Sequence, residues 1–186
     1  RNSVTSHAKT LGYENTSVKA PTAYVKAQVN DASTPNVTMP EGYAFTTTIN
    51  GVSYQFVNTV ERTIQPSNGI YVFGAESGIP VYEGTWATTR FTVNLSDADQ
   101  KFIIPNNNVD ISTIKVQVQN SAADTTTTNY SKSTSLVDIT SATTAFFCQE
   151  TVNGEWEIYF GDGVVGKSLI DGNIVILKYV ITNGAS

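Results

Sequence analysis

One stretch of this chain, residues 161 to 168, has the residue types and the spacing of a phosphate-binding loop. Its sequence GDGVVGKS fits the pattern G-x-x-x-x-G-K-[ST], in which backbone N–H groups and a lysine hold the phosphates of a nucleotide. Such a loop opens a helix, because the helix N-terminus supplies unpaired N–H groups and a partial positive charge. Here Gly172 soon follows Ser168, and an apolar run of strand-forming residues begins at Ile174. We therefore expect a turn and a strand after this stretch, and no nucleotide site.

The same residues are better interpreted as a structural turn. Glycine adopts positive φ without steric cost, and an aspartate can accept hydrogen bonds from the N–H groups that follow it. We predict a glycine-rich connection that locks the last two strands of the chain together. The residues of this structural turn motif are Phe160, Gly161, Asp162, Gly163, Gly166, Asp171 and Gly172.

The chain has one cysteine, Cys148, and one histidine, His7, which together could form a nucleophile and its base. Cys148 follows Phe146 and Phe147 in an apolar run, so we interpret it as a small core residue. A structural zinc ion takes about four Cys or His ligands, and a disulfide takes two cysteines. We expect no catalytic residue, no metal and no cofactor.

Paired carboxylates are the catalytic groups of most glycosidases. The acidic residues on predicted hairpin strands and in one loop are Glu150, Glu155, Glu157, Asp97 and Asp99. Nothing in the sequence places two of them across a cleft, so we interpret them as solvated charges. The pairs Asp162-Gly163 and Asp171-Gly172 resemble pieces of calcium loops, but the D-x-D-x-D-G spacing is missing.

Aromatic side chains on strands could form a sugar-stacking face, although they are more often core residues or cross-strand pairs. The candidates are Tyr24, Tyr43, Tyr54, Tyr71, Tyr82, Trp86, Tyr130, Trp156 and Tyr159. A carbohydrate-binding or adhesin β-domain is therefore our alternative function.

The charge of the chain argues against two classes of partner. It has 11 Lys and Arg against 16 Asp and Glu, and a formal net charge of −5. Nucleic acids and anionic membrane surfaces are bound through clustered basic residues, so we expect neither as a partner. No apolar run reaches the ~20 residues that span a membrane.

The pattern of apolar residues predicts a mainly β chain. Alternation over residues 23–29 is typical of a half-buried strand. Asn50-Gly51 and Asn153-Gly154 each lie between β-rich runs and predict hairpins, because a type I′ turn needs positive φ at both central residues. We expect antiparallel β-sandwich-like layers with a short N-terminal helix at residues 3 to about 10.

We predict three segments along the chain. Residues 1–20 are a helix tail and linker from a preceding region, and residues 21–96 form a first β subdomain. Residues 97–186 form a second β subdomain that contains the Phe-Gly-Asp-Gly turn. Both ends suggest a fragment of a longer protein. The Ser- and Thr-rich residues 121–135 are predicted to form a hairpin tip with a short strand near Tyr130.

Several short motifs together carry a resemblance to a known family. They are Leu11-Gly12-Tyr13, residues 17–23 (SVKAPTA), 102–106 (FIIPN), 110–113 (DIST), 160–167 (FGDGVVGK), 171–173 (DGN) and the strand 174–179. The chain resembles the baseplate-J-like proteins of contractile phage tails, and among them the baseplate wedge subunits of T4-like phages. The resemblance runs from Leu11 to the C-terminus, and the FGDG piece is its most specific part.

This resemblance implies a structural component of the virion and not an enzyme. Such subunits assemble as wedges in a sixfold ring, contact other wedge subunits and copies of themselves, and rearrange when the tail contracts. The resemblance also implies a location in the phage tail baseplate after assembly in the host cytoplasm. Residues 121–135 contain none of the family's motifs.

Overall fold

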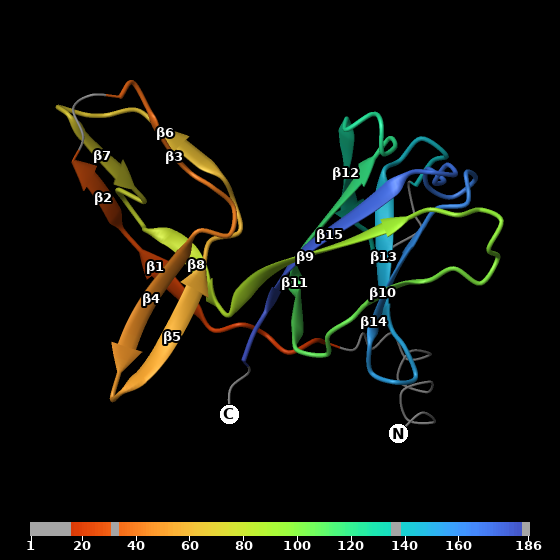
Figure 1. Ribbon diagram of the computed structural model, residues 1–186, viewed down its shortest axis with the longest axis horizontal. Coiled ribbons are helices and arrows are strands. Elements are labelled where there is room, and N and C mark those ends of the chain that lie inside the picture. Colours follow the sequence, from red (N-terminus) through yellow and green to blue (C-terminus); the bar gives the residue numbers. More distant parts are fainter. Residues whose placement is uncertain (1–15, 31–33, 135–138, 184–186) are drawn as a thin grey trace. The chain divides into compact units, whose positions relative to one another are not determined.

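The computed structural model describes residues 16–30, 34–134 and 139–183, in two compact units (Figure 1). Unit 1 contains residues 88–107 and 114–178, and unit 2 contains residues 18–87, 108–113 and the chain from 179 onward. The helix predicted near residues 3 to 10 lies outside the described residues. The predicted boundary between residues 96 and 97 stays a prediction.

Unit 2 is built from short antiparallel strands. Its strands are β1 (Thr22–Val25), β2 (Ala27–Asn30), β3 (Val37–Met39), β4 (Ala44–Ile49), β5 (Val52–Val57), β6 (Arg62–Ile64), β7 (Ile70–Phe73) and β8 (Ile79–Glu83). They form a four-stranded sheet in the order β1-β8-β5-β4 and two two-stranded sheets, β2-β7 and β3-β6. The strand predicted over residues 23–29 is therefore interrupted at Lys26, and its halves join different sheets.

The core of unit 2 forms where these small sheets meet. Met39, Phe73, Ile79 and Val81 are buried together. A second cluster joins Ala20, Val57 and Val180, with Tyr82 and Trp86 packed against it. Side chains from distant parts of the sequence therefore hold each cluster, and no single hairpin could bury them alone.

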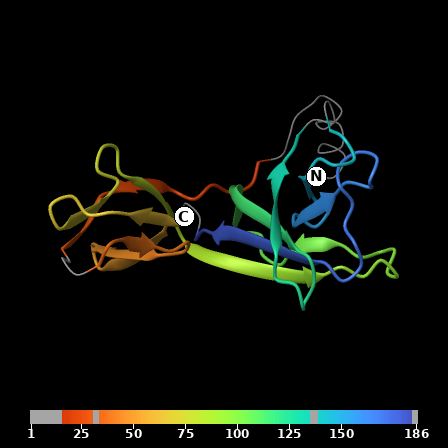
Figure 2. The same cartoon turned by 90° about the horizontal axis from the view of Figure 1, so that it is seen from above.

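Unit 1 contains most of a seven-stranded sheet. Its strands are β9 (Thr85–Thr92), β10 (Phe102–Ile104), β11 (Val109–Gln119), β12 (Thr127–Lys132), β13 (Ala145–Glu150), β14 (Trp156–Phe160) and β15 (Ile174–Ile181). The order is β10-β14-β13-β12-β11-β15-β9, and β15 lies beside β9 in both views (Figures 1 and 2). Strands β9, β11 and β15 contribute residues to both units.

The mainly β prediction is confirmed, and so are the predicted hairpins. Strands β4 and β5 pair across Asn50 and Gly51, whose φ angles are 51° and 81°. Strands β13 and β14 pair across the second predicted turn, and β11 and β12 enclose the Ser- and Thr-rich tip. The pairing is not antiparallel throughout, because β12 and β13 are parallel at Ser131 and Lys132.

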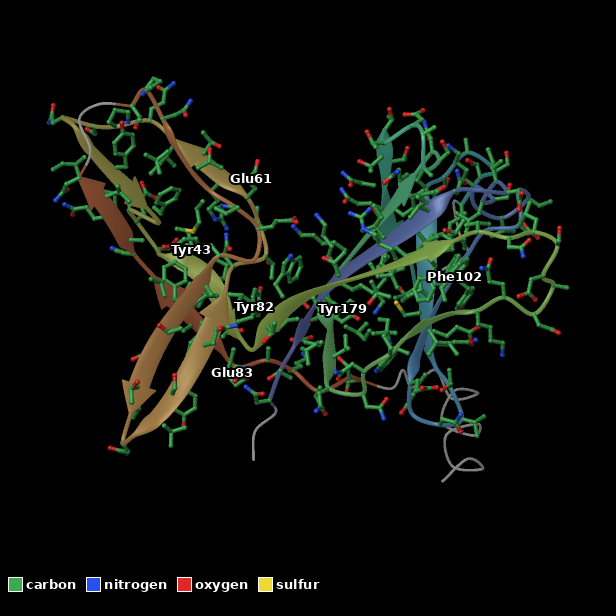
Figure 3. The ribbon with its side chains drawn as sticks, in the orientation of Figure 1. Tyr43, Glu61, Tyr82, Glu83, Phe102 and Tyr179 are labelled. Carbon is green, nitrogen blue, oxygen red and sulfur yellow. The ribbon has the colours of Figure 1, made fainter. Side chains whose placement is uncertain are left out.

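Aromatic rings from several strands of unit 1 pack against one another. Phe160 makes edge contacts with Phe102 and Tyr130, with ring centroids 5.7 Å and 5.4 Å apart. Phe102 in turn meets Phe91 at 5.6 Å. Figure 3 shows Phe102 among the side chains inside this unit. Phe160, the first residue of the predicted turn motif, therefore joins strands that are distant in sequence.

Candidate functional site

The glycine-rich connection, residues 161–173, runs from β14 to β15. We predicted that it locks these two strands together as neighbours, and this is wrong. Strands β13, β12 and β11 lie between them in the sheet. The connection therefore crosses from one part of the sheet to another, which is why it needs more residues than a tight turn.

Asp162 organises the first part of the connection. Its Oδ1 accepts hydrogen bonds from the N–H groups of Val164 and Val165, each at 2.9 Å. The bonds from Val165 and Val164 hold the pKa of this carboxyl below its usual value, because they favour the charged form. The side chain is exposed, so it shapes the loop without entering the core.

The glycines of the connection allow close backbone approach. A Cβ on Gly161 would lie 2.3 Å from the carbonyl carbon of Gly166. Gly163 has a φ of 89° and its N–H donates to the carbonyl of Gly166 at 3.0 Å. Two further bonds run from Gly166 N to Thr140 O (3.1 Å) and from Lys167 N to Thr143 O (2.8 Å). The loop is thus fastened to the segment that precedes β13.

The second part of the connection is fastened to the chain after β9. Asp171 Oδ1 accepts from the N–H of Leu95 at 2.9 Å, and Gly172 N donates to Val93 O at 2.9 Å. The Asn173 side chain accepts from Ile170 N and donates to Asn120 O, both at 2.8 Å. The hydrogen bonds of Asp171, Gly172 and Asn173 therefore all lie within unit 1.

The phosphate-loop pattern does not have the geometry that it requires. Lys167 and Ser168 are exposed and belong to no helix, and a turn at Asp171 and Gly172 leads directly into β15. A phosphate site of this type depends on the N–H groups of a helix that starts at the Lys-Ser pair. The expected turn followed by a strand is confirmed.

The other predicted chemical groups described by the structure lie on the hairpin of β13 and β14 and in the loop after β9. Cys148 is half-buried on β13, opposite Ile158, while His7 lies outside the described residues. Glu157 accepts a hydrogen bond from Gln149 at 2.9 Å. Asp97 accepts one from the N–H of Asp99 at 3.1 Å. Within residues 16–30, 34–134 and 139–183, no three His, Cys, Asp or Glu side chains form a metal-binding group.

The aromatic candidates differ widely in exposure. Tyr71, Tyr130 and Trp156 are buried, whereas Tyr24 is 69% exposed and Tyr43 is 48% exposed. Tyr159 stacks on Phe147 across β13 and β14, with ring centroids 5.2 Å apart. The buried members of the set therefore act as core residues.

Sequence reasoning missed a buried carboxylate in unit 2, Glu83 (Figure 3). It is 6% exposed, at the end of β8. Its two oxygens accept from Thr182 Oγ1 (2.7 Å), Asn183 N (3.2 Å) and Asn183 Nδ2 (2.7 Å). A buried carboxylate is tolerated only when it is hydrogen-bonded, so these bonds tie the chain after β15 to β8.

A second buried carboxylate, Asp110, lies near the start of β11 and is 2% exposed. One oxygen accepts from Ala20 N at 2.9 Å. The other accepts from the N–H and the hydroxyl of Ser112, at 2.9 Å and 2.6 Å. The neighbouring Thr113 hydroxyl accepts from Val180 N at 3.0 Å. Asp110 thus anchors the backbone at Ala20, just before β1, to the start of β11.

The sequence contained a signal for these two residues. Ile79, Val81 and Glu83 alternate along β8 and are all buried, so the period of two placed Glu83 on the inward face. Asp110 lies between Val109 and Ile111, which are both apolar. The partners of both carboxylates are far away in sequence and had no local signal.

Residues 89–181 match the family described as the bacteriophage baseplate wedge protein gp6, third domain. The match covers half of the chain and extends from β9 to β15. The chain belongs to this family. The glycine-rich connection and the buried Asp110 of β11 both lie within the residues that match this family.

The chain is also similar to the protein called "Baseplate wedge protein gp6" of Enterobacteria phage T4. The two are 26% identical over 207 residues, which cover 100% of this chain and 29% of the phage protein. The chain therefore spans less than a third of the length of this relative.

No helix among the described residues is long and apolar enough to cross a membrane.

Proposed function

We propose that this chain is a structural segment of a baseplate wedge subunit in a contractile phage tail. It acts through protein–protein contacts, in assembly of the baseplate ring and in the rearrangement that accompanies tail contraction. The observation that supports this proposal is the match of residues 89–181 to the third domain of wedge protein gp6. The relation to the wider baseplate-J-like group rests on the motifs described above.

The partners proposed for the chain are other wedge subunits and copies of itself, in the virion tail baseplate after assembly in the host cytoplasm. We propose no catalytic activity, no cofactor, no nucleic-acid partner and no membrane partner. The turn motif serves the fold, since Asp162 and Asp171 accept backbone hydrogen bonds within unit 1. The buried carboxylate Glu83, hydrogen-bonded to Thr182, likewise serves the fold of unit 2.

Immunogold electron microscopy of purified virions with an antibody against this chain tests the proposal. We expect label at the baseplate and no label on the capsid. When the full-length protein that contains this chain is mixed with its neighbouring wedge subunits, the proteins should elute together in gel filtration. Absence of label from the tail, with the antibody active on denatured virions, would overturn the proposed role.

The alternative, a carbohydrate-binding or adhesin β-domain, is not favoured by the family match. A glycan array separates the two functions. We expect no saturable binding to any defined glycan. Micromolar binding that is lost in Tyr43→Ala, an exposed aromatic of unit 2, would favour the alternative.

A further inference from the structure

Strand β4 forms an open edge of the four-stranded sheet in unit 2. It pairs with β5 alone among the described strands, and the hairpin that they form projects from the rest of the unit (Figure 1). Gly84 N donates to the Gln55 carbonyl at 2.9 Å, so Gln55 turns its backbone groups toward β8. Thr46 lies opposite Gln55, and its N–H and C=O therefore point away from β5. Ala44 and Thr48 share this direction, because backbone groups alternate along a strand.

This edge lacks the features that protect the other edges of the two larger sheets. Natural proteins protect exposed edges with charges, prolines, bulges or short strands. At the opposite edge of the same sheet, β1 has four residues and lies between Pro21 and Lys26. At the edges of the seven-stranded sheet, β10 has three residues and β9 carries Arg90. Strand β4 has six residues, and no charged residue or proline lies between residues 43 and 60. The β4 edge is therefore open to a further strand.

The hairpin also has an apolar face that extends beyond the core of unit 2. Phe45 and Phe56 lie opposite each other and pack against the buried core cluster. Alternation along β4 places Ile49 on the same face as Phe45. Ile49 is 56% exposed, and Val52, its partner on β5, is 53% exposed. A strand added at the β4 edge would therefore cover part of an exposed apolar surface.

We propose that β4 pairs antiparallel with β4 of a second copy of this chain, about a two-fold axis at Thr47. Outward backbone groups must meet outward groups across such a pair, so the axis passes through a residue and not between two residues. The axis at Thr47 places Phe45 opposite Ile49 and Thr46 opposite Thr48, each of them twice. An axis at Thr46 would instead place Phe45 opposite Thr47.

The sequence of β4 is complementary to itself in this register. Phe45 of each copy lies opposite Ile49 of the other copy on the apolar face, and pairs of an aromatic and a β-branched residue are favourable. Thr46 lies opposite Thr48 on the other face, where the two hydroxyls can bond to each other. No like charges meet, because the hairpin has none. A two-fold contact also closes on itself, which limits the assembly to a pair.

These matches favour a second copy of the chain as the occupant of the edge. The place of the pair in a baseplate rests on the proposed function, whereas the pairing itself does not. One strand from each copy buries well below about 1,200 Å², so the isolated chain should associate weakly. A covalent trap is therefore the suitable measurement.

Disulfide trapping in the isolated chain tests the pairing. The two Thr47 residues form a pair without mutual hydrogen bonds, whose Cα atoms lie about 4.5 Å apart, and this distance suits a disulfide. In a C148S background with oxidised glutathione, T47C should form a covalent dimer about tenfold faster than S53C does. Ser53 is the matched control, because it is also exposed but lies on β5, away from the edge. Equal rates for T47C and S53C, or a faster reaction of T46C, would overturn the proposal.

Charged variants of the T47C chain test the register. T46K/T48K places lysines opposite each other twice across the axis and should reduce trapping to the rate of the S53C control. T46K/T48E places each lysine opposite a glutamate and should restore trapping. Both variants change the same two exposed residues. Failure of folded T46K/T48E to restore trapping would overturn the Thr47 axis. If the charged variants do not fold, the comparison of T47C with S53C still decides.

The place of the pair is tested in virions whose full-length protein carries T47C, with the unsubstituted protein as the control. Mild oxidation should link two copies of that protein in the baseplate. A link to a different protein would overturn the second copy as the occupant. Trapping in the isolated chain, without a link in baseplates that contain the chain, would refute the pair as a baseplate contact. Absence of the chain from the baseplate would instead refute the proposed function and leave the pairing intact.

Discussion

The carboxylate of Glu83 and the hydroxyl of Thr182 form a 2.7 Å hydrogen bond across 99 positions of sequence. Asn183 adds two more bonds to the same carboxylate. Strand β15, which begins in unit 1, therefore ends on a buried acceptor of unit 2. Gly84 allows a close backbone approach within unit 2, because a Cβ there would lie 2.1 Å from the carbonyl oxygen of Ile181.

Replacement of Glu83 by Gln should lower the free energy of unfolding by about 1–3 kcal/mol. The amide keeps one acceptor but turns an NH₂ donor toward the donors Thr182 and Asn183. Urea unfolding measures the loss, and a double-mutant cycle with Thr182→Val should show coupling. Glu76→Gln is the control, since Glu76 is exposed. A loss no larger than that of the control would contradict the role of Glu83 as an anchor.

The Asp124 carboxylate, in the turn between β11 and β12, should make stability depend on pH. A side-chain bond from Asn120 and backbone and side-chain bonds from Thr126 lower its pKa from 3.8 to about 2. Because the folded pKa is depressed, the stabilisation is present above pH 3.8 and is lost as the pH falls through about 2.

We therefore expect Asp124→Asn to be less stable than the wild type at pH 6 and to converge with it near pH 2. Thermal unfolding at several pH values measures this convergence. A constant difference between the two proteins over the whole range would contradict the assignment.

Gly161→Ala should destabilise unit 1 by about 1–3 kcal/mol or more, because the new methyl group overlaps the Gly166 backbone. Gly172→Asn is the contrast. Gly172 has a φ of 79° with open space around its Cβ position, and asparagine tolerates this conformation better than other residues. Melting temperatures should fall sharply for the first variant and little for the second. The reverse order would mean that backbone contact does not fix the connection.

Phe160→Leu should cost about 1–3 kcal/mol, because two edge contacts between aromatic rings are lost while most apolar area is kept. The contacts are those with Phe102 and Tyr130. Chemical denaturation measures the effect. In the double variant with Tyr130→Leu, the loss of unfolding free energy should be smaller than the sum of the two single losses. Full additivity would show that the Phe160 and Tyr130 rings do not interact.

The sequence by itself determined the local geometry of this protein. Asn50 and Gly51 form the predicted turn because positive φ is a property of the residues themselves. Asp162 binds the N–H groups just after it for the same local reason. Alternation of apolar residues identified most strands, because it reflects which face each residue presents.

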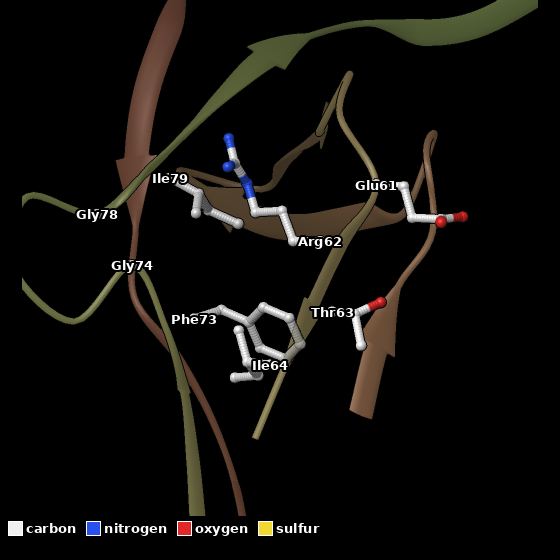
Figure 4. A pocket seen from close by; sticks show the side chains of 8 residues that line it. All are labelled: Glu61, Arg62, Thr63, Ile64, Phe73, Gly74, Gly78 and Ile79. Atoms are coloured by element: carbon white, nitrogen blue, oxygen red, sulfur yellow. The ribbon is translucent and has the colours of Figure 1, made fainter. Parts of the chain in front are cut away.

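Only the tertiary structure decided which strands are neighbours and which polar groups meet. The separation of β14 from β15 and the parallel pairing of β12 with β13 depend on packing between distant segments, which has no local signature. The same is true of the bond between Glu83 and Thr182. The pocket lined by residues of β6, β7 and β8 (Figure 4) brings together three different sheets, and no pattern within residues 61–79 encodes that approach.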